Sequence, residues 1–320
     1  MLTQLLNACR ARTGTSVNDD LVQSTRSFLA HANAEPDALR QLAATARELP
    51  PPGAAWVALT LGTAIEQGAR PEIAGPTLLE HFRHWMSTLP HVPPGEDDDP
   101  IPEPTPEQAA LLESFPEICT AVVAHLAHMP DTRRALASDD AFIARLEELE
   151  SYGWGATWVR ETLLRTSGTL VVLHPPSGKG LRLRYENVHH CFHLFSLIQT
   201  AIGTRIPGGK EPDPNVAGAA RGHSDQSVSD AAWWHFGDPR SPTAEIGASI
   251  WGEAPARSIP FVDDVQVILL WPTLLGSRSW DSGFFNPHLA ALPADAFVES
   301  ELTAEQVRSW FDKLGIDASK

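Results

Sequence analysis

Apolar residues recur at helical spacing over the first half of the chain, from the N-terminus to about residue 165. The segments 36–49, 54–67 and 76–89 each place their apolar side chains on one face of a helix. Prolines stand at or near the starts of these segments, and Gly68 follows the second one, as expected of residues that begin and end helices. The pattern predicts a series of helices joined by short turns.

Residues 91–106 interrupt this pattern, because prolines there surround an unbroken run of acidic residues. Such a segment can neither continue a helix nor bury an apolar face, so we expect an exposed linker. Helical spacing resumes at Glu107, is expected to break near Pro116, and then continues. Six or more helices with short connections predict an all-α helical bundle, or a stack of helical hairpins, in residues 1–165.

The second half of the chain has the pattern of a sheet. Alternating or β-branched runs at 169–174 and 180–188 flank the turn sequence PPSGKG, which predicts a β-hairpin. Residues 265–272 have the length and the β-branched content of a buried strand. Sheet pairing through hairpins favours antiparallel neighbours.

The C-terminal residues add a strand at 297–302 and a helix at 303–314. Thr303 and Gln306 have the spacing of a capping box, which marks the start of that helix. We therefore expect residues 166–320 to form an α+β domain with a mainly antiparallel sheet. The chain as a whole is predicted to belong to the α+β class.

A long segment at 203–257 is rich in Gly, Pro, Ser and Asp and carries several large aromatic residues. Trp233, Trp234 and His235 are consecutive, and Trp251 follows in the same segment. Aromatic side chains in a loop either pin it to the core or form a recognition surface, because they offer a large contact area with few rotatable bonds. We expect a long aromatic loop with one short helix near residues 215–221, and with pinning as the commoner role of its aromatic residues.

Composition narrows the classes of partner. Of the 320 residues, 42% are hydrophobic and 20% are charged, which is typical of a soluble globular protein. The net charge is -16, and residues 1–150 contribute -12 of it, with 10 Arg and no Lys against 22 Asp and Glu. A chain this acidic lacks the clustered cations that general binding to nucleic acid or to anionic membranes requires.

Cysteine spacing, apolar runs and the ratio of Arg to Lys indicate in which cellular compartment the protein is expected. Cys9, Cys119 and Cys191 lie far apart and form no metal-binding or disulfide pattern, which favours a reducing compartment. The sequence contains no run of about 18 apolar residues, so we predict no membrane span. An excess of Arg over Lys, with abundant Ala, Gly and Pro, fits a bacterial protein, and we expect a cytoplasmic one.

Three histidines crowd into the stretch ENVHHCFHLF, residues 186–195. On a helix that begins near residue 188, His189, His193 and Ser196 lie on one polar stripe, while His190 points elsewhere. Two imidazoles at positions i and i+4 can bind one zinc ion, although the glutamate of the metalloprotease motif is missing here. Acid–base catalysis without a metal and a buried helix with backbone-bonded histidines are the alternatives.

A polar loop follows the predicted buried strand at 265–272 and contains Arg278, Trp280 and Asp281. Loops beyond buried strands often carry functional residues. Arg278 could hold a small anionic ligand through a carboxylate or phosphate, or it could pair with Asp281.

These observations favour protein binding over catalysis. No catalytic motif has its required spacing, and no cofactor is predicted. We expect an adaptor or scaffold component of a bacterial cytosolic multi-protein assembly, with a protein partner. The alternative is a metal-assisted hydrolase that uses zinc bound by His189 and His193.

Overall fold

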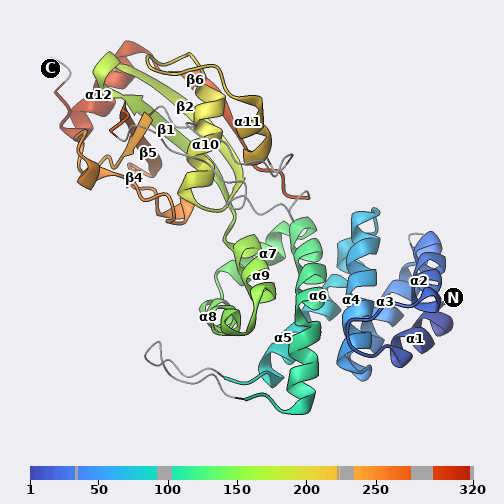
Figure 1. The fold of residues 1–320 in the computed structure, drawn as a ribbon. Helices are drawn as coiled ribbons and strands as arrows, with labels where there is room; N and C mark the ends of the chain where they lie inside the picture. Colours follow the sequence, from blue (N-terminus) through green and yellow to red (C-terminus); the bar gives the residue numbers. More distant parts are fainter. Residues whose placement is uncertain (33–34, 92–102, 222, 224–233, 275–290, 318–320) are drawn as a thin grey trace. The chain divides into compact units, whose positions relative to one another are not determined.

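The computed structural model describes residues 1–32, 35–91, 103–221, 223, 234–274 and 291–317. Over these residues the chain has 12 α-helices, mostly in its first half, and one mixed sheet in its second half (Figure 1). It divides into two compact units, Met1–Leu163 and Leu164–Lys320. The predicted α+β class is confirmed.

The first unit is helical throughout its described residues. Helices predicted from the apolar spacing are present, although the second of them begins at Pro51, three residues before the predicted start at residue 54. The elements are α1 (Leu2–Ala11), α2 (Asp19–Ala32), α3 (Pro36–Thr45), η1 (Ala46–Glu48), α4 (Pro51–Glu66), η2 (Pro71–Ile73), α5 (Gly75–Thr88), α6 (Pro106–His128), α7 (Pro130–Ala137), α8 (Asp140–Leu149), η3 (Glu150–Tyr152) and α9 (Trp154–Leu164).

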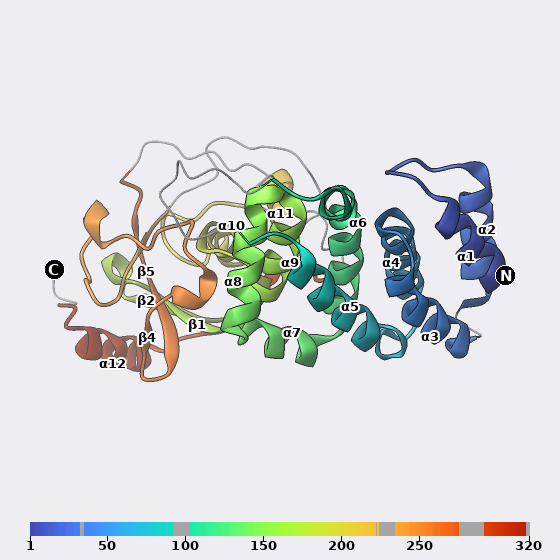
Figure 2. The same ribbon diagram turned by 90° about the horizontal axis from the view of Figure 1, so that it is seen from below.

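Helix α4 is the core of the first unit. It lies between α6 and the pair α1–α2 (Figure 2), and its side chains are buried on most of its faces. Small residues permit this close packing, since a Cβ at Gly62 would lie 3.1 Å from the Cα of Ala121 in α6. A helix that is apolar all round belongs in the interior.

Helix α6 runs without interruption through Pro116, so the predicted break there is wrong. Proline removes one backbone donor, but the inner face of α6 is buried against α4, and this packing outweighs the local cost. Among the described residues, α6 is the one helix whose length and apolarity would suffice to cross a membrane. Its most apolar stretch is 56% buried within the structure, as in the core helix of a globular unit.

A buried arginine ties three parts of the first unit together. The Nη1 and Nη2 atoms of Arg12 donate to Oε2 and Oε1 of Glu117 in α6, at 2.7 and 2.8 Å. Nη1 also donates to the carbonyl of Pro52 in α4 at 2.8 Å, and the guanidinium lies 4.9 Å from the ring centroid of Trp56. Because Arg12 is 4% exposed, its charge depends on these partners.

The second unit is built on a sheet with the strand order β3-β5-β1-β2-β6, and β4 pairs with β5 off this path. The hairpin β1–β2 forms as predicted, with Gly178 in the left-handed conformation at its turn. Neighbouring strands are antiparallel except for β1 and β5, which are parallel. The elements are β1 (Thr166–His174), β2 (Lys179–Val188), α10 (Cys191–Ile202), α11 (Pro214–Ala220), β3 (Trp234–Gly237), β4 (Phe261–Val262), β5 (Val265–Pro272), β6 (Asp295–Glu301) and α12 (Ala304–Leu314).

The segment 203–257 contains the predicted short helix, α11, and also a strand that the sequence did not predict. This strand, β3, is buried and pairs antiparallel with β5. Apart from β3, its described residues are held by turns and by isolated backbone hydrogen bonds. The sequence prediction failed here because a four-residue strand gains its stability from the neighbouring strand and has too few residues to show a period.

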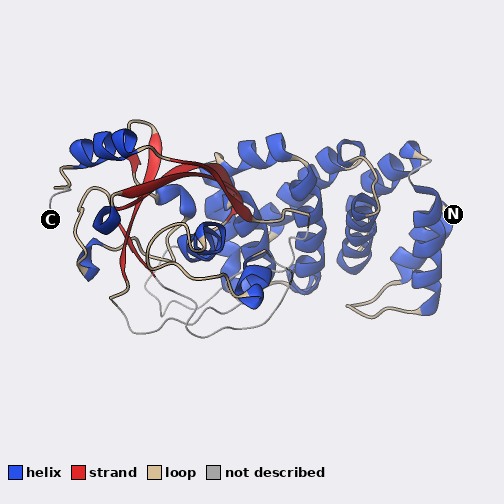
Figure 3. Ribbon diagram, turned by 90° about the horizontal axis from the view of Figure 1, so that it is seen from above, coloured by secondary structure: helices blue, strands red, loops and turns tan. Residues whose placement is uncertain are grey.

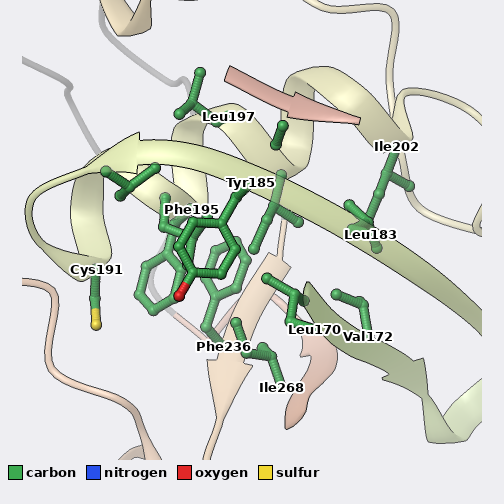
Figure 4. Packing of buried hydrophobic residues seen from close by; sticks show 14 of the residues in the cluster. Leu170, Val172, Leu183, Tyr185, Cys191, Phe195, Leu197, Ile202, Phe236 and Ile268 are labelled. Carbon is green, nitrogen blue, oxygen red and sulfur yellow. The ribbon is translucent and has the colours of Figure 1, made fainter. Parts of the chain in front are cut away.

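Both faces of the sheet carry a core, with α12 on one face and α10 with α11 on the other (Figure 3). Val171 and Val267 point to the α12 face, and Leu170 and Ile268 point to the α10 face. On the α10 side, aromatic rings fill the space between helix and strands (Figure 4). Side chains alternate along each strand, so a strand covered on both faces is apolar at every position.

Replacing Arg12 by Ala should destabilise the first unit by about 3 kcal/mol, because Glu117 would then keep a partly buried charge without its partner. Urea unfolding of the full chain measures this loss. The matched control is Arg40→Ala, which removes an exposed pair with Asp37 and should change the free energy of unfolding by less than about 0.5 kcal/mol. Equal losses for the two variants would contradict the role assigned to Arg12.

Candidate functional site

Helix α10 begins at Cys191, three residues later than the start at residue 188 that we predicted. Backbone before this point is extended at His190, and Asn187 has a positive φ of 53°. His189 therefore precedes the helix, and the expected i,i+4 pair of His189 and His193 on one helical face is wrong. The helix begins later than predicted because His190 acts as its N-cap. The spacing of apolar residues gives no information about such a cap.

Every backbone donor in the first turn of α10 has an acceptor. Cys191 N donates to Ala254 O at 2.9 Å, and Phe192 N donates to Gly252 O at 2.8 Å. His193 N donates to Nδ1 of His190 at 3.1 Å. Helix starts normally leave such donors to water or to capping side chains. Here, residues 252–254, some sixty positions along the chain, complete the helix start.

His193 is a buried, neutral imidazole. Its side chain is 2% exposed, and its Nε2 donates to Ala220 O of α11 at 2.7 Å. Burial lowers the pKa of His193 to about 3, and the nearby charges of Arg165 and the two neighbouring histidines act in the same direction. At neutral pH this histidine therefore serves as a hydrogen-bond donor.

The hydroxyls that follow His193 along α10 are also bonded, and Ser196 is buried whereas Thr200 is half-buried. Ser196 Oγ donates to Phe192 O at 3.1 Å, and Thr200 Oγ donates to Ser196 O at 2.9 Å, both within α10. Together with the bond from His193 to Ala220 in α11, these contacts use carbonyls of the protein's own backbone. They agree with the interpretation of a buried helix with backbone-bonded histidines.

Metal binding by His189 and His193 stays a prediction from the sequence. Within the ranges that the structure describes, no three His, Cys, Asp or Glu side chains gather in a way that could hold a metal ion. Because Nε2 of His193 carries the hydrogen that it donates to Ala220, a metal bound at that atom would have to break this bond.

Trp234 and His235 belong to the interior. Trp234 is buried on the α10 face of the sheet, and its Nε1 donates to Pro207 O at 3.4 Å. His235 Nε2 lies 3.1 Å from Oγ of Ser249, whose hydroxyl hydrogen goes to Ile246 O at 2.5 Å. A hydroxyl has one hydrogen, so Ser249 accepts from His235, and the pair does not have the arrangement of a nucleophile with its base.

Four predicted site residues cannot be placed. Trp233, Arg278, Trp280 and Asp281 lie outside the described residues. The recognition of a small anion by Arg278, and its pairing with Asp281, stay predictions. Of the aromatic residues in 203–257, Trp234 pins the segment to the core, as the commoner interpretation expected.

Among the described residues of this segment, Trp251 is an exposed aromatic residue, and sequence reasoning did not choose it as a site residue. Its side chain is 77% exposed. The next residue, Gly252, lies against the ring of Phe192 in α10, and a Cβ at this position would overlap that ring. A tryptophan directly before a glycine in a polar segment was the available signal, because the glycine permits a close contact that fixes the backbone beside an exposed ring.

Comparison of the chain with protein-family models, with curated proteins and with solved structures finds no match. The function of the protein is therefore inferred from the chemistry of the residues described above.

Acid should weaken the second unit through His193. In the unfolded chain an imidazole takes up a proton near pH 6.5, whereas the folded-state pKa is about 3. Between these values the unfolded chain binds the additional proton, so the free energy of unfolding falls as the pH falls below 6.5 and is fully regained above it.

The variant His193→Gln keeps a donor for Ala220 O but does not titrate. We expect its free energy of unfolding to be lower than that of the wild type at pH 7.5. Lowering the pH to about 5 should reduce this difference by about 2 kcal/mol, because acid destabilises only the wild type at this site. Urea unfolding at the two pH values measures the change. A deficit that is the same at both would show that His193 is protonated in the folded protein.

Proposed function

We propose that this protein is an adaptor or scaffold component of a bacterial cytosolic multi-protein assembly and that it binds a protein partner through Trp251. The observation that carries the proposal is a tryptophan 77% exposed on a backbone that hydrogen bonds hold on both sides. Tryptophan is enriched among the residues that dominate binding energy at protein interfaces. Exposing so large an apolar side chain is unfavourable in water, and a partner would bury it.

Backbone contacts before and after Trp251 support a preformed binding surface. On the N-terminal side, Ile250 N donates to Phe236 O in β3 at 2.9 Å. On the C-terminal side, the carbonyls of Gly252 and Ala254 accept from the start of α10. A segment fixed in this way loses little conformational entropy when a partner binds, so more of the contact energy appears as affinity.

A second apolar side chain is exposed in the same segment. Ile246 is 60% exposed, five residues before Trp251, and lies in η5 (Ile246–Ala248). Such an aliphatic side chain could add apolar area to an interface that an aromatic residue of the same segment anchors.

Replacing Trp251 by Ala should abolish partner capture while leaving the fold intact. The full-length tagged protein is used to capture proteins from a lysate of its source organism, and the captured proteins are quantified against the variant. Trp154→Ala is the matched control, since Trp154 is 76% exposed but belongs to the other unit. With the purified partner, Trp251→Ala should raise the dissociation constant by at least about thirtyfold, as expected when a hot-spot residue is lost. A partner that binds Trp251→Ala as tightly as the wild type would refute the proposal.

Replacing Gly252 by Ala should also weaken partner binding, although Trp251 itself is retained. The new Cβ would overlap the Phe192 ring, so the segment must move away from α10 and the indole loses its fixed position. We expect a smaller loss than for Trp251→Ala, measured as the dissociation constant of the same partner. Gly247→Ala is the control, because a Cβ there meets no atom within 4 Å. Similar affinities for Gly252→Ala and the wild type would show that the indole needs no fixed backbone.

A further inference from the structure

A pocket of about 300 Å³ opens in the first unit, between three walls formed by helices. One wall is formed by η1 and the start of α4, the second by the last turns of α5, and the third by the first turns of α6. Its volume is at the lower end of the range typical of small-molecule sites. None of the residues discussed for protein binding lies in it.

The deeper lining of the pocket is apolar. Leu49, Trp85 and Leu111 contribute to it from the three walls, and each of them is also part of the buried core of the unit. Their positions are thus set by the packing of the helices. A rigid apolar lining of this size suits one aliphatic or aromatic side chain.

Neutral polar groups at the start of α6 are already engaged with one another. Thr105 and Gln108 form a capping box, in which Gln108 N donates to Thr105 Oγ and Thr105 N donates to Gln108 Oε1. Gln108 Nε2 donates to Thr88 O on the opposite wall at 2.8 Å. These bonds hold the two walls together, and they leave the charged side chains as the groups that could recognise a ligand.

Two opposite charges line the same pocket without pairing. Arg47 and Glu107 are exposed, and neither forms an ion pair or a side-chain hydrogen bond with any described residue. Other arginines of this unit do have carboxylate partners, as Arg12, Arg83 and Arg145 show. His84 adds a second basic group to the wall that faces Arg47.

From this arrangement we infer that the pocket binds a small zwitterion with an apolar side chain, which is the chemistry of a free α-amino acid. Arg47 binds the carboxylate, since a guanidinium can donate two parallel hydrogen bonds to it. Glu107 accepts from the ammonium group, and the apolar lining around Trp85 receives the side chain. The inference is independent of the role proposed for Trp251, which lies in the other unit.

Three probes that differ in one charge each test the assignment on the full-length protein. L-Phenylalanine carries both charges, N-acetylphenylalanine lacks the ammonium, and phenylalaninamide lacks the carboxylate. Ligand-observed NMR titrations give the dissociation constants. The wild type should bind phenylalanine saturably in the millimolar range or tighter, and each analogue about three- to tenfold more weakly, as expected for single charged contacts near the surface.

Two variants then assign each charge to a residue. Arg47→Gln should remove the preference for phenylalanine over phenylalaninamide, and Glu107→Gln should remove the preference over N-acetylphenylalanine. Arg26→Gln and Glu113→Gln are the controls, because both residues are exposed in the same unit and line no part of the pocket. All four changes are at exposed positions, where substitutions are usually tolerated.

The inference is overturned if the wild type shows no saturable binding of phenylalanine up to its solubility. It is equally overturned if the three probes bind alike, or if Arg47→Gln and Glu107→Gln leave both preferences unchanged. Partner capture through Trp251 does not enter these measurements, so the two proposals fail separately.

Discussion

The backbone bonds between the start of α10 and residues 252–256 are the contacts on which the second unit depends. An α-helix leaves its first N–H groups without partners inside the helix, and a buried donor without an acceptor is costly. Here Cys191 and Phe192 donate to carbonyls of the distant segment, and Ala256 N donates back to His189 O at 3.1 Å. These bonds fix where α10 begins, and they hold residues 252–256 against the start of that helix. They also hold the backbone beside Trp251, which makes an exposed indole part of a rigid surface.

The histidines of this region gain a structural meaning from the same contacts. His190 must keep a lone pair on Nδ1 to accept from His193 N, and His193 must keep a hydrogen on Nε2 to donate to Ala220 O. Two imidazoles thus take opposite roles within one helical turn, one as an acceptor and one as a donor. The acceptor role is lost if Nδ1 of His190 takes up a proton, whereas Nε2 of His193 carries a hydrogen in the neutral form that burial favours and in the protonated form. One of these histidines thus caps α10, and the other joins α10 to α11.

The first unit depends on a different constraint, which is the close approach of α4 and α6. Small residues such as Gly62 and Ala121 bring the two backbones together, and the pair Arg12–Glu117 adds a bidentate contact at the edge of this core. A long helix so firmly packed can keep Pro116 in its interior. The rigid packing of these helices also shapes the pocket beside Trp85, so the proposed ligand site and the proposed docking surface belong to separately stabilised parts of the chain.

Local chemistry determined the parts of this protein that the sequence alone could predict. The hairpin β1–β2, the strand β5 and the capping box at Thr303 follow from residue period and turn chemistry, which act within a few positions. Tertiary structure alone decided that α10 begins after His190, that α6 continues through Pro116, and that Trp234 is buried while Trp251 is exposed. Each of these outcomes depends on an acceptor, a helix face or a strand contributed by residues that are distant in the chain. A local pattern carries no information about such partners, because burial and hydrogen bonding are properties of the assembled fold.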